Sequence, residues 1–440
     1  MERSWRAYPG FVERPPEPRL PKPIQFLLIW YRTIPFLERC RRKLGNTFAV
    51  HSPPFGRLLY IADPADIKRV FTGDPALFHA GDANAFIMEP VLGKHSLLVL
   101  DEEEHMRERK MLLPHFHGEA VRRYAETMAS VTAAEVDSWR VGQRVAMRPA
   151  MQRIGLEVIL RAVIGVSDPV RLASLRRLLP RMSGLTPLIQ AMWMWPWLGR
   201  FGPWKRYRRL LAETDAVLHE EIAARRADPS GDDILSLLVQ TGSLSDEQLR
   251  DEVMTLLVAG HETTATALAW AFERLVRHPE ALERARSGDD DYLDAVVKET
   301  LRVRPVVADV VRTVTSETEV GGYTVPAGTI VLPAVALVQR SESYDEPSAF
   351  RPERFLDGSA APYTWIPFGG GVRRCIGAAF ATLEMKTVLR EVLARVELAP
   401  VRAGDEGTRV SGVMMLPDRA GEVLVAARRS VGDRQLVSAG

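Results

Sequence analysis

Residues 245–277 constrain the fold more than any other segment, because they predict one helix long enough to cross a whole domain. Ser245 and Gln248 have the spacing of a capping box, which marks a helix N-terminus. No proline follows until Pro279, so about 30 residues can form one helix about 45 Å long. An apolar helix of this length is expected to cross the core of a large, mostly helical domain.

The middle of this predicted helix contains residues that weaken helices. Gly260, Thr263 and Thr264 lie there beside the carboxylate of Glu262, and a glycine costs about 1 kcal/mol relative to alanine in a helix interior. A packing kink is one explanation. The other is a functional groove in which the backbone opens toward a ligand.

The remaining pattern is mainly helical. Helical periodicity runs from Asp101 to about Arg390, and short strand signals occur at 57–62, 310–314, 319–325 and 329–332 and near the C-terminus. The fold class is therefore mainly α with small β-sheets (α+β). No internal repeat and no linker between independent domains is present.

The N-terminal part of the sequence predicts a leader, a helix and a loop. Its prolines predict an extended leader over 1–23, and a single domain then occupies 24–440. That domain is expected to open with an amphipathic surface helix over 24–43. Residues 80–98, with Gly81 and Gly93, are expected to form a long irregular loop.

Composition narrows the class of protein. Apolar residues make up 46% and charged residues 26%, which is typical of a globular chain. A formal net charge of +2 gives no reason to expect a nucleic-acid partner. No apolar run approaches the roughly 20 residues of a spanning helix, so no transmembrane segment is expected. Two cysteines, Cys40 and Cys375, cannot form a disulfide framework, and a cytoplasmic location is expected.

The segment around Cys375 is the strongest chemical signal. Residues 368–377 read Phe-Gly-Gly-Gly-Val-Arg-Arg-Cys-Ile-Gly, and the three glycines allow a tight backbone around the thiol. A helix is predicted to follow directly, and the N-terminus of a helix favours a thiolate. Such a thiolate serves as a nucleophile or as a metal ligand, and no catalytic-triad signature accompanies it.

The pattern Phe-x-x-Gly-x-Arg-x-Cys-x-Gly resembles the haem-binding loop of cytochromes P450. Three further segments match that family in order: 299–302 its Glu-x-x-Arg helix, 351–355 its arginine segment and 259–264 its oxygen-activating helix. The resemblance covers the chain from about Asp63 to the C-terminus. It implies the cytochrome P450 fold, with a single large haem-containing domain of the soluble bacterial type around a long central helix.

The resemblance also implies the cofactor, haem b (iron protoporphyrin IX), with Cys375 as the thiolate ligand of its iron. His105, Arg109, Arg312 and Arg373 would bind the two propionates; a surface role is the alternative for Arg312. The other implied haem contacts are Ala259, Gly260, Phe368, Gly369 and Gly377.

Two more groups of residues receive roles from the resemblance. Glu262 and Thr263 match an acid–alcohol pair that is catalytic: the hydroxyl hydrogen-bonds bound dioxygen and the carboxylate brings protons to it. Glu299, Arg302 and Arg354 would form a buried structural network behind the cysteine loop. The alternative is that they form an exposed ion pair that adds little to stability.

The resemblance places a substrate pocket over an apolar set of residues, although a place in the core is the better interpretation for any single one of them. Asp309 is the exception, since it could anchor a polar or cationic substrate group or pair with a neighbouring arginine. The predicted lining consists of Phe86, Ile87, Met88, Leu92, Met182, Trp193, Ala259, Val306, Val307, Asp309, Met414 and Met415.

The function implied is that of a monomeric haem-thiolate monooxygenase, which uses O2 to hydroxylate or epoxidise a hydrophobic small molecule such as a fatty acid, terpenoid, steroid or polyketide. Electrons would come from a ferredoxin or flavodoxin with its reductase. Two alternatives are a haem-thiolate isomerase or peroxygenase, which needs no reductase, and a non-enzymatic haem ligand sensor. The expected docking surface for the electron donor consists of Arg107, Lys110, Arg122, Arg123 and Arg374.

Overall fold

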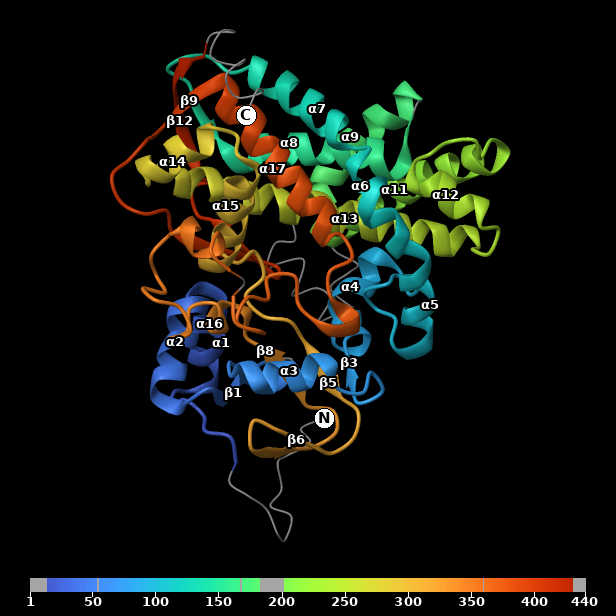
Figure 1. Ribbon diagram of the computed structural model, residues 1–440. Helices are drawn as coiled ribbons and strands as arrows, with labels where there is room; N and C mark the ends of the chain where they lie inside the picture. Colours follow the sequence, from blue (N-terminus) through green and yellow to red (C-terminus); the bar gives the residue numbers. More distant parts are fainter. Residues whose placement is uncertain (1–13, 54, 167, 183–201, 359, 430–440) are drawn as a thin grey trace.

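The computed structural model describes residues 14–53, 55–166, 168–182, 202–358 and 360–429. A helix-rich part and a smaller part around the largest sheet lie against each other (Figure 1), as expected for a mainly α chain with small sheets. The helices are α1 (Lys22–Tyr31), α2 (Thr33–Leu44), α3 (Pro64–Thr72), α4 (Gly81–Leu92), α5 (Glu102–Leu112), α6 (Gly118–Arg122), α7 (Ala125–Asp137), α8 (Met147–Ile159), α9 (Pro169–Met182), α11 (Gly202–Ala227), α12 (Ile234–Gln240), α13 (Asp246–Leu275), α14 (Pro279–Arg286), α15 (Asp290–Val303), α16 (Val335–Val338) and α17 (Ala378–Arg395).

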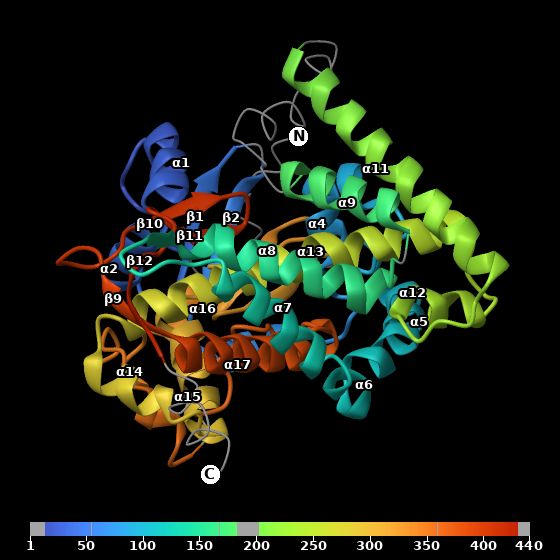
Figure 2. The ribbon, with the colours of Figure 1, turned by 90° about the horizontal axis from the view of Figure 1, so that it is seen from above.

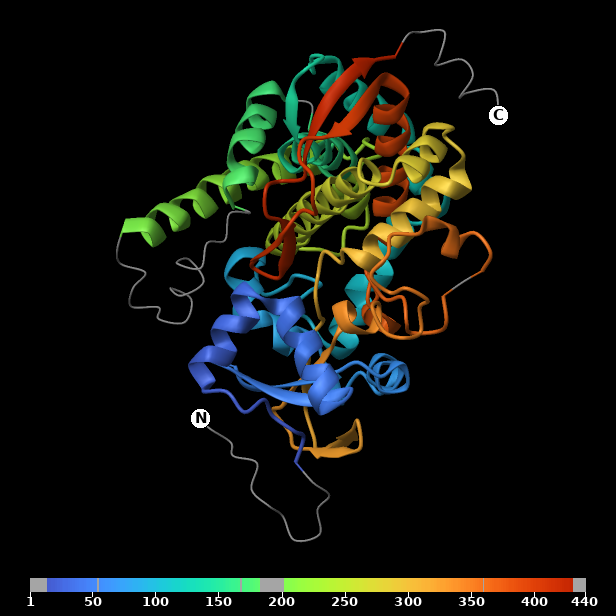
Figure 3. The same ribbon diagram turned by 90° about the vertical axis from the view of Figure 1, so that its left-hand side faces the viewer.

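The strands form four small sheets. The largest has the order β1-β2-β8-β5-β3, in which only β2 and β8 run parallel. Its N-terminal strands, drawn in blue, lie beside the N-terminal helices in the smaller part of the molecule (Figure 3). The order β4-β12-β9 forms a second sheet, and β10 with β11 and β6 with β7 form two hairpins. The strands are β1 (Thr47–Ser52), β2 (Gly56–Ile61), β3 (Phe78–His79), β4 (Arg144–Ala146), β5 (Arg312–Val314), β6 (Thr318–Val320), β7 (Tyr323–Val325), β8 (Ile330–Pro333), β9 (Val396–Pro400), β10 (Thr408–Ser411), β11 (Met414–Pro417) and β12 (Glu422–Arg428).

The long central helix is confirmed as α13, which spans 30 residues. Its capping box is complete: the Ser245 hydroxyl accepts a hydrogen bond from the Gln248 backbone N–H (3.2 Å), and the Gln248 side chain accepts one from the Ser245 N–H (2.9 Å). The helices α8, α11, α15 and α17 all contact α13 (Figure 2). The indole of Trp270 is fully buried and donates a hydrogen bond to the Met415 carbonyl (2.9 Å), which ties α13 to β11.

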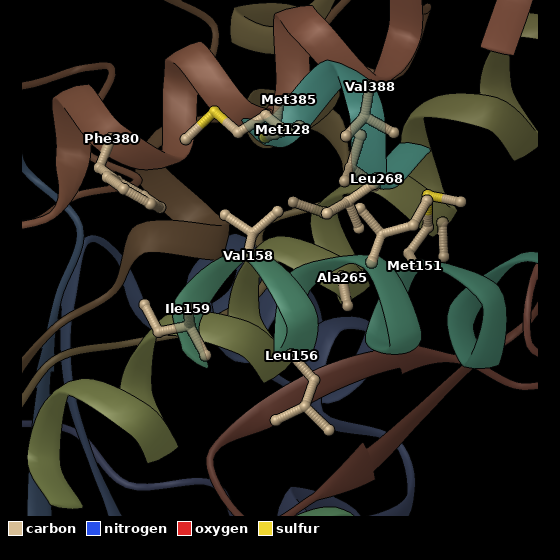
Figure 4. Close-up of a cluster of buried hydrophobic side chains, with 14 of the residues drawn as sticks. Met128, Met151, Leu156, Val158, Ile159, Ala265, Leu268, Phe380, Met385 and Val388 are labelled. Carbon is tan, nitrogen blue, oxygen red and sulfur yellow. The ribbon is translucent and has the colours of Figure 1, made fainter. Parts of the chain in front are cut away.

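The main hydrophobic core lies where α8, α13 and α17 meet. Val158 from α8, Ala265 and Leu268 from α13, and Met385 and Val388 from α17 gather in one buried cluster (Figure 4). Each of these side chains is at most 1% exposed. Burial of apolar surface contributes about 25 cal/mol per Å2, so this cluster stabilises the packing of the three helices.

The expected irregular loop over 80–98 is wrong, because residues 81–92 form α4. The carboxylate of Asp101 accepts hydrogen bonds from the backbone N–H groups of Ala80 (3.0 Å), Gly81 (2.9 Å) and Asp82 (2.8 Å). These are the N–H groups that a helix N-terminus leaves without partners. A residue about 20 positions downstream supplies the cap, so the local sequence carries no helix-start signal.

The expected single helix over 24–43 is also wrong, since α1 and α2 are separated at Arg32. Pro35 lies in the first turn of α2, where its missing N–H is tolerated. In a continuous helix the ring of Pro35 would clash with the carbonyl of residue 31, so the helix must restart. The extended segment before α1 already contacts the domain, since the Ala49 N–H donates to the Pro16 carbonyl (2.9 Å).

Within the described residues, no helix combines the length and the apolar character needed to cross a bilayer. The cytoplasmic location, the monomeric state and the boundary between leader and domain stay predictions.

A buried carboxyl group on α13 makes the stability of this fold depend on pH. The Glu252 side chain is fully buried, and burial, followed by repulsion from Glu108, raises the pKa of Glu252 to about 8. The folded chain therefore holds a proton that the unfolded chain releases near pH 4.5. Stability must fall as the pH rises from the unfolded pKa to the folded one.

We expect Glu252→Gln to stabilise the protein at alkaline pH, because the amide keeps the shape of the neutral acid and cannot ionise. The gain in unfolding free energy should be near zero at pH 5 and reach on the order of 1–3 kcal/mol at pH 9. Urea unfolding at both pH values measures it. The control is Glu220→Gln, an exposed carboxylate on α11; an equal, pH-independent effect in both variants would contradict the account.

Candidate functional site

The loop that carries Cys375 is shaped by its close approach to α3. Gly369 and Gly371 have φ values of 67° and 63°, a region that favours glycine. A Cβ atom on Gly370 would overlap the ring of Phe71, and one on Gly371 would overlap the Phe71 carbonyl. The loop closes with a hydrogen bond from the Cys375 N–H to the Phe368 carbonyl (2.9 Å). Glycine is therefore required at positions 370 and 371.

Cys375 is exposed, whereas Cys40 is buried. Burial raises the pKa of the Cys375 thiol, while the Gly377 N–H and the charges of Arg109 and Arg374 lower it. The expectation that the position before a helix favours a thiolate stays a prediction, and burial of the thiol acts against it. A coordinating metal ion deprotonates a thiol outright, so this sulfur fits a metal ligand better than a free nucleophile.

Three arginines and a histidine gather on the same side of the molecule. Burial, followed by the charges of Arg373, Arg109 and Arg312, lowers the pKa of His105 to about 3, so the imidazole is neutral. Burial and Arg373 lower the pKa of Arg312 to about 10. Arg109, whose pKa responds to the charge of Cys375, also lowers the pKa of Arg373. The four side chains therefore form one cationic cluster beside the thiol.

The cationic cluster carries more positive charge than its described surroundings neutralise. Among the described residues, Asp101 forms the ion pair with Arg373, and no ion pair is made by Arg109 or Arg312. A small pocket is lined by Phe71, His105, Arg312 and Arg373, among others. Buried guanidinium groups repel each other electrostatically, and a bound anion relieves this repulsion. This donor set fits a ligand with two carboxylates, as haem has.

The middle of α13 opens on one side only. Ala259 is exposed, and Val258, Gly260 and Thr263 are partly exposed, whereas the residues on either side are buried. A Cβ atom on Gly260 would lie 2.8 Å from the side chain of Ile159, so glycine lets α8 approach there. The Thr263 hydroxyl donates to the Ala259 carbonyl (2.8 Å). The weak helix formers thus provide both a close helix contact and an open face.

Glu262 points away from this open face and toward α8. Its carboxylate accepts hydrogen bonds from Arg148 (2.6 Å) and Gln152 (2.5 Å), and it is 2% exposed. Arg148 is itself partly exposed, so the pair connects the buried acid with the surface. Sequence reasoning missed Arg148 and Gln152. Their i, i+4 spacing, which puts two long polar side chains on one face of a mostly apolar helix, was the available signal.

A buried ionic network lies behind the cysteine loop. Glu299 and Arg302 are fully buried and make two hydrogen bonds (2.7 and 2.8 Å). Arg354 donates to the same carboxylate (3.0 Å), as does the backbone N–H of Arg351 (2.8 Å). Arg302 also donates to three backbone carbonyls, those of Gln339 (3.0 Å), Pro347 (2.8 Å) and Ala349 (2.9 Å).

This network is connected to the cysteine loop through aromatic side chains. The Trp365 indole donates a hydrogen bond to the carbonyl of Lys298 (3.1 Å), the residue before Glu299. The ring of Trp365 also packs edge-on against that of Phe368 at the start of the loop, with 6.1 Å between the ring centroids.

The predicted pocket residues fall into several environments. Val307 and Met414 face each other in an isolated β-bridge, and Met88 is partly buried against the main core. Leu92 and Val306 are buried in that core, whereas Phe86 is 43% exposed and packs against Phe55 (5.6 Å). Ile87 is partly buried, Met182 and Met415 are buried, Asp309 is partly exposed, and Trp193 lies outside the described residues.

We expect Glu299→Gln to destabilise the protein by about 3–5 kcal/mol, because it leaves the buried charge of Arg302 without a counter-charge. Equilibrium unfolding in urea measures the loss. The matched control is Glu346→Gln, which removes the exposed partner of Arg351 and should cost less than about 1 kcal/mol. A similar small loss in both variants would contradict a structural role for the network.

Comparison with known proteins identifies the family. The cytochrome P450 family model matches residues 15–424. Cytochrome P450 135B1 of Mycobacterium tuberculosis is 45% identical over 436 residues, which cover 95% of this chain and 92% of that protein. Cytochrome P450 135A1 of the same organism is 40% identical over 433 residues, with 95% and 96% covered.

Solved structures agree at the level of the fold. Retinoic acid-bound cyanobacterial CYP120A1 superposes with a TM-score of 0.81 at 24% identity, over 94% of this chain and 99% of that one. The haem domain of cytochrome P450DA gives a TM-score of 0.80 at 24% identity, over 96% and 98% of the two chains. With a family model over nearly its whole length and relatives this similar, the chain belongs to the cytochrome P450 family and is a haem-containing monooxygenase.

Proposed function

We propose that this cytochrome P450 hydroxylates or epoxidises a hydrophobic small molecule with electrons from separate redox proteins. The observation that supports the proposal is that the chain offers three features with matching chemistry: the Cys375 thiol, the cationic cluster that includes Arg109 beside this thiol, and the open face of α13 at Ala259. Each of the three suits a different part of haem: its metal, its carboxylates and the side on which dioxygen reacts.

Haem b, when bound, supplies the redox chemistry that cleaves the O–O bond. Cys375 would be its thiolate ligand, and the Gly377 N–H beside the sulfur would tune the electron density of that ligand. His105, Arg109, Arg312 and Arg373 would hold the two propionates. The neutral imidazole of His105 would donate a hydrogen bond, and the arginines would add charge.

Protons would reach the site through the acid–alcohol pair of α13. Thr263 presents its hydroxyl on the open face beside Ala259 and Gly260. Glu262 does not reach that face, because Arg148 and Gln152 hold its carboxylate on the side of α8. Proton delivery therefore requires the carboxylate to exchange these partners for water or for Thr263, and Arg148 would control that exchange.

The electron donor is proposed to be a ferredoxin or a flavodoxin. Arg107 and Lys110 of α5, Arg122 of α6, Arg123 and Arg374 are all exposed. The helices α5 and α6 are joined through the turn at Leu113–Phe116, which also contacts α17 directly after the cysteine loop. An acidic protein that docks there would approach the thiolate side of the haem, where electrostatic steering speeds association.

We expect Thr263→Ala to separate the consumption of reductant from the formation of product. A hydroxyl that positions protons contributes on the order of 100-fold to a rate, so product formation should fall by about that factor while electron uptake continues. The test supplies a plant-type ferredoxin with its reductase, isotopically labelled dioxygen and a panel of hydrophobic compounds. The mass of the product and the ratio of product to reductant consumed are measured.

The matched control is Thr264→Ala, since this neighbour is buried and faces away from the open face. This variant should keep the same ratio of product formed to reductant consumed as the unchanged protein. One labelled oxygen atom per product supports the proposal. Product formed from hydrogen peroxide alone, with no labelled oxygen from O2 in the complete system, would instead assign a peroxygenase. Carbon monoxide binding with no turnover of any compound would assign a ligand sensor.

A further inference from the structure

The helix α1 carries its polar side chain on the inside and apolar side chains on the outside. Gln25 is the one residue of α1 that is buried. Its amide donates to the carbonyls of Pro18 (3.3 Å) and Leu20 (2.8 Å) and accepts a hydrogen bond from the His51 N–H (2.9 Å). Since α1 also contacts β1 and β10 (Figure 2), the fold fixes which face of this helix points outward.

The outward side of α1 is apolar. Ile24, Leu27 and Tyr31 are exposed, and their spacing places them on one face of the helix. Leu20, directly before the helix, is exposed as well. Nine large hydrophobic side chains are exposed among the described residues, and these are four of them. Single exposed apolar residues are common, whereas a group of them on one face marks an interaction surface.

Basic residues flank this apolar face at both ends. Arg19 and Lys22 come before Ile24, and Arg32 directly follows Tyr31. All three basic side chains are exposed, and none of the three forms an ion pair with another residue in the part of the chain that the structure describes. The apolar face of α1 therefore lies between positive charges that the protein leaves unneutralised.

The same imbalance extends over the whole N-terminal segment. Residues 14–43 contain eight basic and two acidic residues, so their formal charge is +6, whereas that of the whole chain is +2. The two acidic residues pair with arginines of other segments: Glu17 with Arg57 (2.8 Å) and Glu38 with Arg340 (3.2 Å). A partner for this surface must therefore combine an apolar region with negative charge.

A second copy of the chain does not meet this requirement. In a two-fold pair the same surface faces itself, so two antiparallel α1 helices would bring Lys22 of one copy close to Arg32 of the other. Like charges across an interface disfavour association. A bilayer with anionic lipids offers acyl chains and phosphates together, and it matches both properties of the surface.

We propose that α1 binds the surface of a membrane that contains anionic phospholipid. The apolar face of α1 enters the boundary between headgroups and acyl chains, and the flanking basic residues contact lipid phosphates. Tyr31 suits this boundary, because aromatic rings with a polar group are favoured there. The helix lies on the membrane and does not cross it. The proposal does not depend on the reaction that the protein catalyses.

The test uses the full-length, haem-loaded protein and two kinds of vesicle: phosphatidylcholine alone, and phosphatidylcholine mixed with phosphatidylglycerol. The fraction of protein that floats with the vesicles gives a partition coefficient for each kind. The unchanged protein should bind the anionic vesicles at least about tenfold more strongly than the neutral ones. Added salt should weaken that binding, because it screens the charges.

Two double variants test the two parts of the surface. Leu27→Gln with Tyr31→Gln should lower partition into the anionic vesicles by about tenfold, because it removes apolar contact with the acyl chains. Lys22→Gln with Arg32→Gln should lower it by about the same factor and should leave the weak binding to neutral vesicles unchanged. All four side chains are exposed, so both variants should keep the haem spectrum of the unchanged protein.

The matched control is Val141→Gln with Val170→Gln. These side chains are 59% and 73% exposed, close to the 51% of Leu27 and the 71% of Tyr31, but they lie outside α1. The control variant should therefore bind anionic vesicles as the unchanged protein does.

Absence of vesicle binding by the unchanged protein would overturn the proposal, and so would an equal loss in the control variant. A dimer in size-exclusion chromatography that the α1 variants dissociate, without vesicle binding, would assign the surface to a second copy instead. Neither readout uses turnover. Vesicle binding without product formation refutes only the proposed function, and product formation without vesicle binding refutes only the role of α1.

Discussion

The burial of α13 on nearly every side is the constraint on which the rest of the structure depends. Among the described elements, helices α8, α11, α15 and α17 pack against it, and Trp270 ties its second half to β11. A helix enclosed in this way can face a ligand only where its own residues are small, and Ala259 and Gly260 supply that opening. The glycine also lets α8 come close, so the residues that weaken the helix locally are those that create the site.

Buried charge organises the site around this helix. The network of Glu299, Arg302 and Arg354 satisfies its charges internally, and it therefore stabilises the structure behind the cysteine loop. The charges of the cationic cluster are not balanced in this way. Burial and the neighbouring arginines lower the pKa values of Arg312 and Arg373, and the described carboxylates do not neutralise the whole positive charge of the cluster. A satisfied network holds a scaffold, and an unsatisfied one binds a ligand of opposite charge.

The sequence predicted those features whose signals are local. The capping box at Ser245 and the absence of proline were sufficient for α13, and the glycines around Cys375 were sufficient for a tight loop. The prediction at α4 was wrong, because Asp101 caps that helix from about 20 residues away. The prediction of one helix over 24–43 was wrong because Pro35 fits the first turn of a new helix and not the interior of a continuous one. Contacts between elements, such as Arg148 with Glu262, depend on how helices pack, and no single segment encodes them.

The most direct test of the account is the reduced-plus-carbon monoxide difference spectrum of the purified protein and of Cys375→Ser. A cysteine thiolate on the iron should give a strongly red-shifted absorption band, which the serine variant should lose. Cys40→Ser is the matched control, because burial raises the pKa of the Cys40 thiol to about 11 and its side chain lies in a different core cluster; the band should persist. A protein without haem, or a band that survives the loss of Cys375, would contradict the central claim.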